Sequence, residues 1–415
     1  MNDRRDFLRA SSLLGFGATV PTFLGNTALA APPADKPGAK DTVLVVVQLT
    51  GGNDGLNTVI PFKNELYYKH RPTIAVPKDR VFGVDAHVGF HPSAAPLGRL
   101  LNDRQAACIV QGVGYPNPDQ SHFRSMDIWH AASTRQDLTE GWIGKSLKTK
   151  PLSAFHLAAD NEIAPLALAG APARVPSLTK LEDFQLRLGG ASGREKGDQK
   201  SLIESVAKGD ASMAKKPDLL DFVRRTAVNT YESTNRIKAI GTNYAPKVPY
   251  PANGFANRLK LAAQLIDAGV GARIFYVSID GFDTHSGQGG ATGTHANLLD
   301  TVAAGISAFW RDLAERGHGD RVCIMTFSEF GRRAKENGSN GTDHGSAAPM
   351  FLVGGKVKAG VVGDHPSLEK IPDGNLVHAI DFRRVYAAVL ENWLGIDAKP
   401  IVGAEHKPLD LFKTA

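Results

Sequence analysis

Uninterrupted runs of apolar residues recur along the chain. The first, at 42–49 (TVLVVVQL), is rich in β-branched residues and shows no polar alternation, which is typical of a strand buried on both faces of a parallel sheet. Similar runs lie at 107–110, 274–279, 322–327 and 350–353. Helical spacing of apolar residues appears at 219–240, 257–268, 297–315 and 377–393. This alternation predicts an α/β fold with a doubly wound, mostly parallel sheet flanked by helices.

The first thirty residues have the features of an export signal. A basic head containing Arg4 and Arg5 precedes a short, glycine-containing apolar stretch that ends in the small-residue site 28–30 (ALA). The twin arginine resembles that of the Tat signal, and a Sec signal with an incidental Arg pair is the alternative. We therefore expect a periplasmic or secreted protein, exported by the Tat translocation machinery.

The rest of the chain is predicted to form one domain, over 42–415. A flexible leader is expected at 31–41, and a mobile polar insertion at about 189–217 (GGASGREKGDQKSLIESVAKGDASMAKKP). No apolar run reaches the roughly 18 residues that a membrane span needs, so no transmembrane segment is expected.

Charge and cysteine content narrow the function classes. The chain has 415 residues, with 48 Lys and Arg against 42 Asp and Glu, and these charges are scattered rather than grouped. We expect no nucleic-acid partner from this pattern. Only Cys108 and Cys323 are present, each in an apolar strand-like run, which excludes a disulfide framework and a cysteine-based zinc site.

Polar segments follow several of the predicted strands, where ligands bind in open α/β sheets. Thr50 to Asn57 follow the first strand, Asp280 to Ser286 follow the strand at 274–279, and Ser328 to Arg333 follow the strand at 322–327. A fourth segment, 341–346 (GTDHGS), precedes its strand but can reach the same edge. Carboxylates and imidazoles of this mix suit Zn²⁺, Mn²⁺, Mg²⁺ or Ca²⁺. Each segment alone is better explained as a turn or a helix cap, but four at one edge favour a metal site.

A nucleophile candidate follows the strand at 107–110. Ser121 lies at a strand-to-helix junction, where backbone N–H groups favour anions, and Arg124 is placed to clamp one. The alternative is that Ser121 is only the helix N-cap. The chain has no G-x-S-x-G, no H-E-x-x-H and no C-x-P-x-R motif. These absences argue against an α/β-hydrolase elbow, a zincin protease and a formylglycine sulfatase.

Five segments in this order resemble a large bacterial family described as domain of unknown function 1501: GGNDGLNTVIP, YPNPDQSHFRSMDIW, GFDTHSGQ, SEFGRR and GTDHG. The resemblance covers nearly the whole chain. The family is placed in the alkaline phosphatase-like superfamily, which includes phosphatases and sulfatases. The resemblance therefore implies an alkaline phosphatase-like sheet and, usually, two metal ions beside a Ser or Thr nucleophile.

Carried over by residue, the resemblance implies specific roles. Asp54 is similar to the first-strand metal aspartate and Ser121 to the nucleophile. Asp283 and His285 resemble one metal's Asp and His, with His344 as that metal's final His. The superfamily's remaining Asp-His pair is replaced by Glu329 and Phe330, and Phe cannot bind a metal.

Two registers follow from this departure. Either Glu329 and Asp54 hold a weaker second ion, or Asp343 and His344 are the shifted Asp-His pair and the final His is lost.

The sequence thus predicts an exported, metal-dependent hydrolase that acts on a small anionic ester of phosphate or sulfate. The predicted catalytic residues are Ser121 and Arg124, and the predicted ligands of the divalent metal ion are Asp54, Asp283, His285, Glu329, Asp343 and His344. The alternative is a non-catalytic binding protein, periplasmic or surface-associated, with an eroded metal site.

Overall fold

The computed structural model describes residues 42–150, 152–181 and 244–414. The predicted signal, leader and polar insertion, and the helix expected at 219–240, lie outside these residues. Among the described residues, no helix has both the length and the apolar character that crossing a membrane requires.

A mixed, mostly parallel sheet lies at the centre of the fold, in the order β11-β5-β10-β9-β1-β8-β6-β7, with β12 added beside β5. Its central strands are β1 (Val43–Leu49), β5 (Ala107–Gly114), β8 (Ala272–Ile279), β9 (Val322–Phe327) and β10 (Ala348–Val353). The outer strands are β6 (Ser153–Leu157), β7 (Ser177–Leu178), β11 (Gly360–Val362) and β12 (Ile380–Asp381). Among the strands in the described part of the chain, only β10 runs antiparallel to its neighbours in this sheet. A second, small sheet contains β2 (Val59–Ile60), β3 (Phe82–Gly83) and β4 (Gly89–Phe90).

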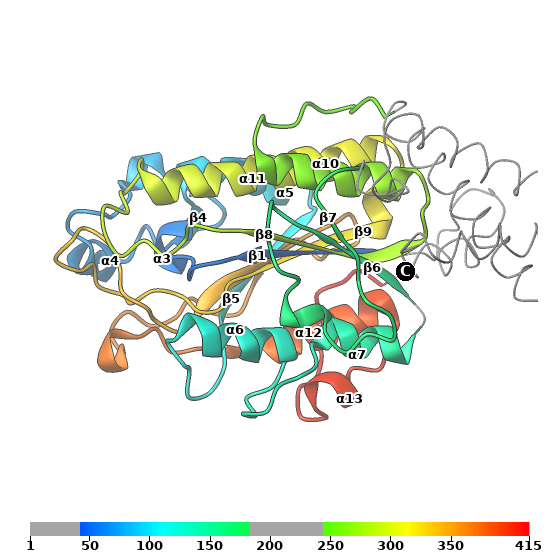
Figure 1. Cartoon of the computed structure of the whole chain (residues 1–415). Helices are drawn as coiled ribbons and strands as arrows, with labels where there is room; N and C mark the ends of the chain where they lie inside the picture. Colours follow the sequence, from blue (N-terminus) through cyan, green and yellow to red (C-terminus); the bar gives the residue numbers. More distant parts are fainter. Residues whose placement is uncertain (1–41, 151, 182–243, 415) are drawn as a thin grey trace, which may run out of the picture.

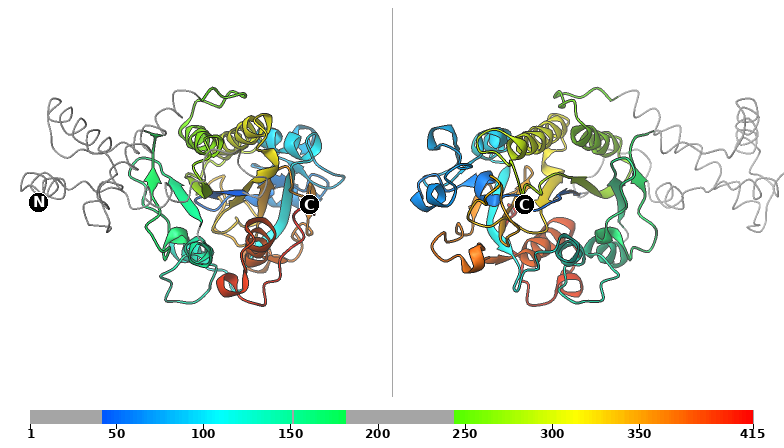
Figure 2. Two further views of the ribbon diagram at one scale, coloured as in Figure 1. Left: turned by 90° about the vertical axis from the view of Figure 1, so that its right-hand side faces the viewer. Right: turned by 60° about the vertical axis from the view of Figure 1, so that its left-hand side comes forward.

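Helices cover both faces of the central sheet (Figure 1). One face carries α5 (Ala95–Asn102), α10 (Gly254–Asp267) and α11 (Thr294–Glu315). The other face carries α6 (His122–Ala131), α7 (Trp142–Thr149), α12 (Phe382–Ala388) and α13 (Lys399–Val402). Figure 2 shows the same three layers from two other sides. The short helices α3 (Gly55–Thr58) and α4 (Glu65–His70) lie beyond the end of β1.

The pattern of β1 explains this layering. Successive side chains of a strand point to opposite faces, so Val43, Val45 and Val47 pack in the core with α10 and α11. Leu44 and Val46 pack in the other core, with α7 and α12. Every residue of β1 is buried, as an uninterrupted apolar run predicts. The predicted doubly wound, mostly parallel α/β sheet flanked by helices is therefore confirmed.

One predicted helix needs correction. The spacing of apolar residues indicated a helix over 377–393, but α12 begins only at Phe382. The side chain of Asp381 caps this helix, accepting a hydrogen bond of 3.0 Å from the Arg383 N–H. The preceding residues instead pair with β5, where the Ala379 N–H donates to Gly112 O. The helix continues beyond α12 as a π-helix over Val389–Leu394.

The two cysteines are buried free thiols. Cys108 lies in β5 and Cys323 in β9, and β10 separates these strands.

Candidate metal centre

Four polar loops meet at the carboxyl edge of the sheet, which α3 marks at the left of Figure 1. The loop after β1 carries Asp54, and the loop after β8 carries Asp283 and His285. His344 lies in the connection from β9 to β10, and His122 is the first residue of α6.

Glycines allow these loops to approach each other closely. Gly51 has φ +116°, and a Cβ on it would lie 2.4 Å from the backbone N of Asp283. A Cβ on Gly341 would lie 2.3 Å from the backbone carbon of His285. Larger residues at either position would push the loops apart, since real Cβ atoms do not come so close.

His122, Asp283, His285 and His344 form one cluster, here named the His–Asp group. The ligand atoms of His122, Asp283 and His344 all lie within 4.8 Å of one another. Asp283 Oδ1 is 3.1 Å from Nε2 of both His285 and His344, and Asp283 Oδ2 is 3.4 Å from His122 Nε2. The two nitrogens His285 Nε2 and His344 Nε2 are 2.8 Å apart.

Each of the three histidines is held by its other ring nitrogen. His122 Nδ1 lies 2.9 Å from Glu329 Oε1, and His285 Nδ1 lies 3.4 Å from Asp343 Oδ1. The third contact joins His344 Nδ1 to the carbonyl oxygen of Gln120, at 2.8 Å. Because these partners are hydrogen-bond acceptors, each Nδ1 carries the proton in the neutral ring. Nε2 then presents its lone pair to the group, which is the arrangement that metal-binding histidines adopt.

Lone pairs that converge in this way repel one another unless a cation lies among them. Zinc bonds at roughly 2.0–2.1 Å in tetrahedral geometry would hold ligand atoms about 3.3 Å apart. The separations that involve Asp283 Oδ1, His285 Nε2 and His344 Nε2 are 2.8 and 3.1 Å, slightly below that value, and His122 Nε2 lies 3.4 Å from the other oxygen of Asp283. His122, Asp283 and His344, whose ligand atoms all lie within 4.8 Å of one another, therefore fit a divalent ion, with His285 beside them. Imidazole nitrogens with a carboxylate suit a transition metal better than Mg²⁺ or Ca²⁺.

Neighbouring groups set the charge states of the ligands. Burial alone would raise the pKa of Asp283, but the hydrogen bond and the positive charge of Arg332 outweigh it and lower the pKa to about 2. The hydrogen bond to Glu329 raises the pKa of His122, whereas burial lowers that of His344. Asp283 is thus an anion at neutral pH, as a ligand must be.

Asp54 lies apart from this group, in a buried cluster. Arg71 donates to both oxygens of its carboxylate, at 2.5 and 2.9 Å, and Gln288 donates to Oδ2 at 2.5 Å. Its Oδ1 also accepts from the Leu56 N–H and thereby caps α3. Both oxygens are taken up by protein donors, so we leave Asp54 out of the metal centre.

Glu329 and Asp343 lie behind the histidines rather than among the ligands. Glu329 is buried, and its Oε1 accepts from the Gly51 N–H as well as facing His122. Asp343 Oδ1 accepts from the Asn337 side chain and faces His285. Both carboxylates therefore orient imidazoles. This arrangement brings His344 into the same group as Asp283 and leaves Asp343 one hydrogen bond away.

Arg124, the predicted anion clamp, and Arg332 both donate their hydrogen bonds to protein groups. Arg124 donates to the carbonyl oxygens of Thr134 and Arg135, in the loop beyond α6. Arg332 is buried, donates to four backbone carbonyl oxygens, and holds Asp283 Oδ1 at 2.6 Å. These contacts leave no support for Arg124 as an anion clamp, and they make Arg332 an anchor for Asp283.

Ser121 is exposed and lies directly before His122, at the N-cap position of α6. Its side chain makes no capping hydrogen bond, so the N-cap interpretation finds no support in its contacts. No hydrogen bond occupies the backbone N–H groups of His122, Phe123 and Arg124 within the described part of the chain.

Sequence reasoning missed His122. The residue stands beside Ser121 in the motif SHFRS, at a strand-to-helix junction of the same predicted edge, and this position was the signal that could have identified it. Phe330 is buried and packs against two of the imidazoles. Its ring centroid lies 4.9 Å from that of His122 and 4.6 Å from that of His344. Phe330 has no atom that could bind a metal, but its packing helps to position the His122 and His344 rings.

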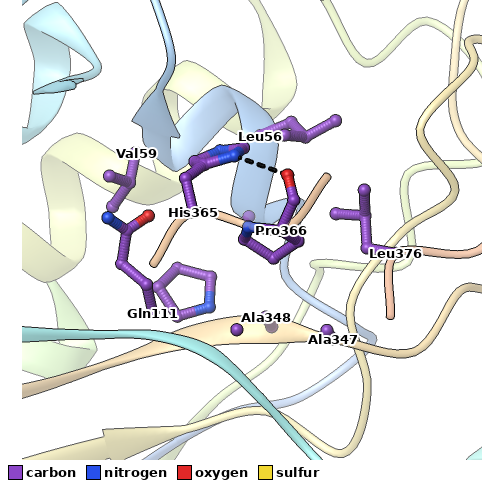
Figure 3. A pocket seen from close by; sticks show the side chains of 11 residues that line it. Leu56, Val59, Gln111, Ala347, Ala348, His365, Pro366 and Leu376 are labelled. Atoms are coloured by element: carbon purple, nitrogen blue, oxygen red, sulfur yellow. Dashed lines mark hydrogen bonds between the residues drawn. The ribbon is translucent and has the colours of Figure 1, made fainter. Parts of the chain in front are cut away.

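A small cavity lies elsewhere, between Leu56, Gln111, Pro349 and His365 (Figure 3). Its volume of about 10 Å³ is room for a single water molecule at most. Burial lowers the pKa of His365, whose Nδ1 faces the carbonyl oxygen of Pro366. This cavity is too small for a substrate.

The fold and the site together define an α/β protein with a candidate metal centre at the carboxyl edge of its sheet. The chain belongs to the family described as "Protein of unknown function (DUF1501)", whose sequence model matches residues 106–405. A comparison with curated proteins finds no match.

Several solved structures are similar to this chain. A sulfatase from Pseudoalteromonas sp. has 12% identity and a TM-score of 0.39, covering 99% of this chain and 75% of that chain. The C-terminal periplasmic domain of EcEptC from Escherichia coli, in complex with Zn, has 10% identity and a TM-score of 0.38, covering 78% and 77%. A protein in the alkaline phosphatase superfamily from Vibrio parahaemolyticus has 10% identity and a TM-score of 0.36, covering 94% and 78%. These likenesses are loose and carry no argument about the site.

Proposed function

We propose that this protein is a metal-dependent hydrolase of phosphate or sulfate monoesters, with one divalent transition-metal ion held by the His–Asp group. The observation that carries the proposal is the convergence of three Nε2 atoms on Asp283, each with its Nδ1 bonded to an acceptor. Among the metals suited to such ligands, Zn²⁺ fits the separations well.

The ion would supply Lewis-acid polarisation of an ester oxygen. The chain's own residues would bind and orient the anionic ester. The N-terminus of α6 presents the unoccupied N–H groups of His122, Phe123 and Arg124, and its dipole favours negative charge. This helix end replaces Arg124 as the expected anion site.

Ser121 is the proposed nucleophile, or the residue that positions the attacking water. Its hydroxyl belongs to an exposed residue beside the ligand His122, and it is not used to cap the helix. An activated hydroxyl next to a metal centre is the usual arrangement for covalent catalysis on such esters.

Turnover of aryl phosphate and aryl sulfate by the zinc-loaded protein tests this proposal. We expect wild-type activity on one of the two esters, and Ser121→Ala should lower kcat by orders of magnitude while the zinc content stays the same. His87→Ala changes an exposed histidine that is distant in sequence from the ligands, and it is the matched control. This variant should keep the wild-type kcat and the wild-type zinc content. A wild-type protein with one zinc per chain and no turnover of either ester would exclude the hydrolase.

A second candidate is a non-catalytic binding protein with a single metal ion. The observation that favours it is the engagement of Asp54 by Arg71, because the superfamily pattern would use that aspartate for a second ion. Metal content and turnover, measured on one preparation, separate the two candidates.

Export through the Tat pathway, to the periplasm or beyond, is part of the proposal. Changing Arg4 and Arg5 together to Lys should leave the precursor in the cytoplasm. Normal export of this double variant would refute the Tat assignment.

A further inference from the structure

Few large apolar side chains are exposed among the described residues, and two of them belong to segments that are joined to the His–Asp group. Phe123 is 87% exposed and Val377 49%, and the third, Ile163, lies in the loop after β6. Single exposed apolar residues are ordinary on protein surfaces. Their position beside the candidate centre is what needs an explanation.

Phe123 directly follows a proposed ligand. It lies in the first turn of α6, one residue after His122, whose ring faces Asp283. Phe123 therefore belongs to the helical turn whose backbone N–H groups would bind the anion. A large group attached to that anion would lie close to this residue.

The segment that precedes Val377 is hydrogen-bonded to the loops of the His–Asp group, in part through Gln120. The carbonyl oxygen of Gln120 holds His344 Nδ1, and its side-chain amide donates to Asn375 Oδ1 at 2.9 Å. Ser346, two residues after His344, donates to the carbonyl oxygen of Leu376. Val377 therefore follows a segment that is bonded on both sides to the loops of the centre.

The charge pattern selects the kind of ligand that fits. The N–H groups of α6 and the proposed ion attract an anion, whereas Phe123 and Val377 offer an apolar surface next to it. We propose that these two side chains bind the alcohol part of the substrate, and that the substrate is an anionic monoester of a flat apolar alcohol, such as an aryl ester. This inference rests on the proposed function and names the substrate class of the same site.

Ligands that the enzyme cannot hydrolyse test this inference by binding alone. The zinc-loaded full chain is titrated in a calorimeter with 2-naphthylphosphonate and with methylphosphonate. A second pair, naphthalene-2-sulfonate and methanesulfonate, distinguishes phosphate-like from sulfate-like head groups. The proteins compared are wild type, Phe123→Ala and Ile163→Ala, the last being a control of equal exposure in another loop.

We expect wild type to bind the naphthyl member of one pair about tenfold more tightly than the methyl member. In Phe123→Ala the ratio of naphthyl to methyl affinity should fall about three- to tenfold, the contribution of an aromatic pair. Ile163→Ala should behave as wild type.

Two results would overturn the inference: equal wild-type affinity for both members of each pair, including no binding of either, or a naphthyl preference that survives in Phe123→Ala. Elemental analysis of the same samples separates this failure from the larger one. If the samples contain zinc but show no naphthyl preference, only the proposed substrate class is wrong. If they contain no zinc, both the proposed function and this inference are wrong.

Discussion

Two clusters, each containing an aspartate that follows a strand of the sheet, lie at its carboxyl edge and differ in the partners of that aspartate. Asp54 belongs to a buried network with Asn57, Tyr67, Arg71 and Gln288, here named the Asp54 network. Every member is fully or almost fully buried. In the His–Asp group, by contrast, the Asp283 side chain is 46% exposed and the His285 side chain 43%.

The difference lies in what satisfies each carboxylate. Burial would raise the pKa of Asp54, but the charge and hydrogen bonds of Arg71 outweigh it, so the pKa is lowered and the pair stays ionised. Asp283 has one arginine contact on Oδ1, and its Oδ2 faces only an imidazole. The Asp54 carboxylate accepts hydrogen bonds from protein donors on both oxygens and so joins the surrounding loops. The Asp283 carboxylate faces imidazole nitrogens, and this arrangement suits a bound cation.

The largest expected effect comes from breaking the Asp54 network. Arg71→Ala leaves the Asp54 carboxylate buried without its cation, so the free energy of unfolding should fall by about 3–5 kcal/mol. Urea denaturation measures the change. Arg135→Ala, which removes an exposed pair with Asp137, is the control and should cost less than about 1 kcal/mol.

The zinc content per folded chain of Arg71→Ala should equal that of wild type, because none of the four proposed ligands contacts Arg71. Loss of zinc in this variant would mean that the two clusters are one site, and the contrast between them would fail.

An intermediate effect is expected from the carboxylate behind His122. Glu329→Gln keeps an oxygen to accept from the Gly51 N–H but removes the charge that holds the imidazole. Zinc affinity should fall by about 10- to 100-fold, as when other such orienting groups are changed. Competition with a chelator measures it.

Glu336→Gln is the matched control, since that carboxylate accepts from the backbone at Thr73 and Ile74 and contacts no histidine. If the two variants bind zinc with equal affinity, the proposal that Glu329 orients the His122 imidazole is wrong.

The smallest effect on the free energy of unfolding is expected at Ser121. Its hydroxyl makes no capping bond, so Ser121→Ala should change the free energy of unfolding by no more than about 0.5 kcal/mol. Asn253 does cap α10, accepting from the Ala256 N–H at 2.8 Å, and Asn253→Ala should cost about 1 kcal/mol. Thermal denaturation of both variants checks the contrast, and a cost at Ser121 equal to that at Asn253 would restore the cap interpretation.

Sequence patterns predicted the central strands because burial on both faces leaves a continuous apolar run. The sequence patterns did not predict the short outer strands β6 and β7. These strands carry polar residues such as His156 and Ser177, which bond to each other across the pair at 2.9 Å. The helix expected from residue 377 failed for a related reason. The apolar spacing continues through 377–381, but backbone pairing with β5 prevails there over the helical pattern.

The candidate site was predicted in part for a physical reason. Parallel strands bring their carboxyl ends together, so the loops of Asp283 and Asp54 could be placed at one edge. Which carboxylate would be paired with an arginine depended on Arg71, a residue whose position no motif indicated. The place of Glu329 behind His122, rather than among the ligands, likewise depends on the direction of a side chain.

Metal content per chain tests the central claim most directly. Protein purified without chelator should contain one zinc or related transition-metal ion per chain by elemental analysis. His344→Ala should contain close to none, and His87→Ala should match wild type. Wild-type protein without stoichiometric metal, even after incubation with Zn²⁺, or a His344→Ala variant that retains its full metal content, would contradict the account.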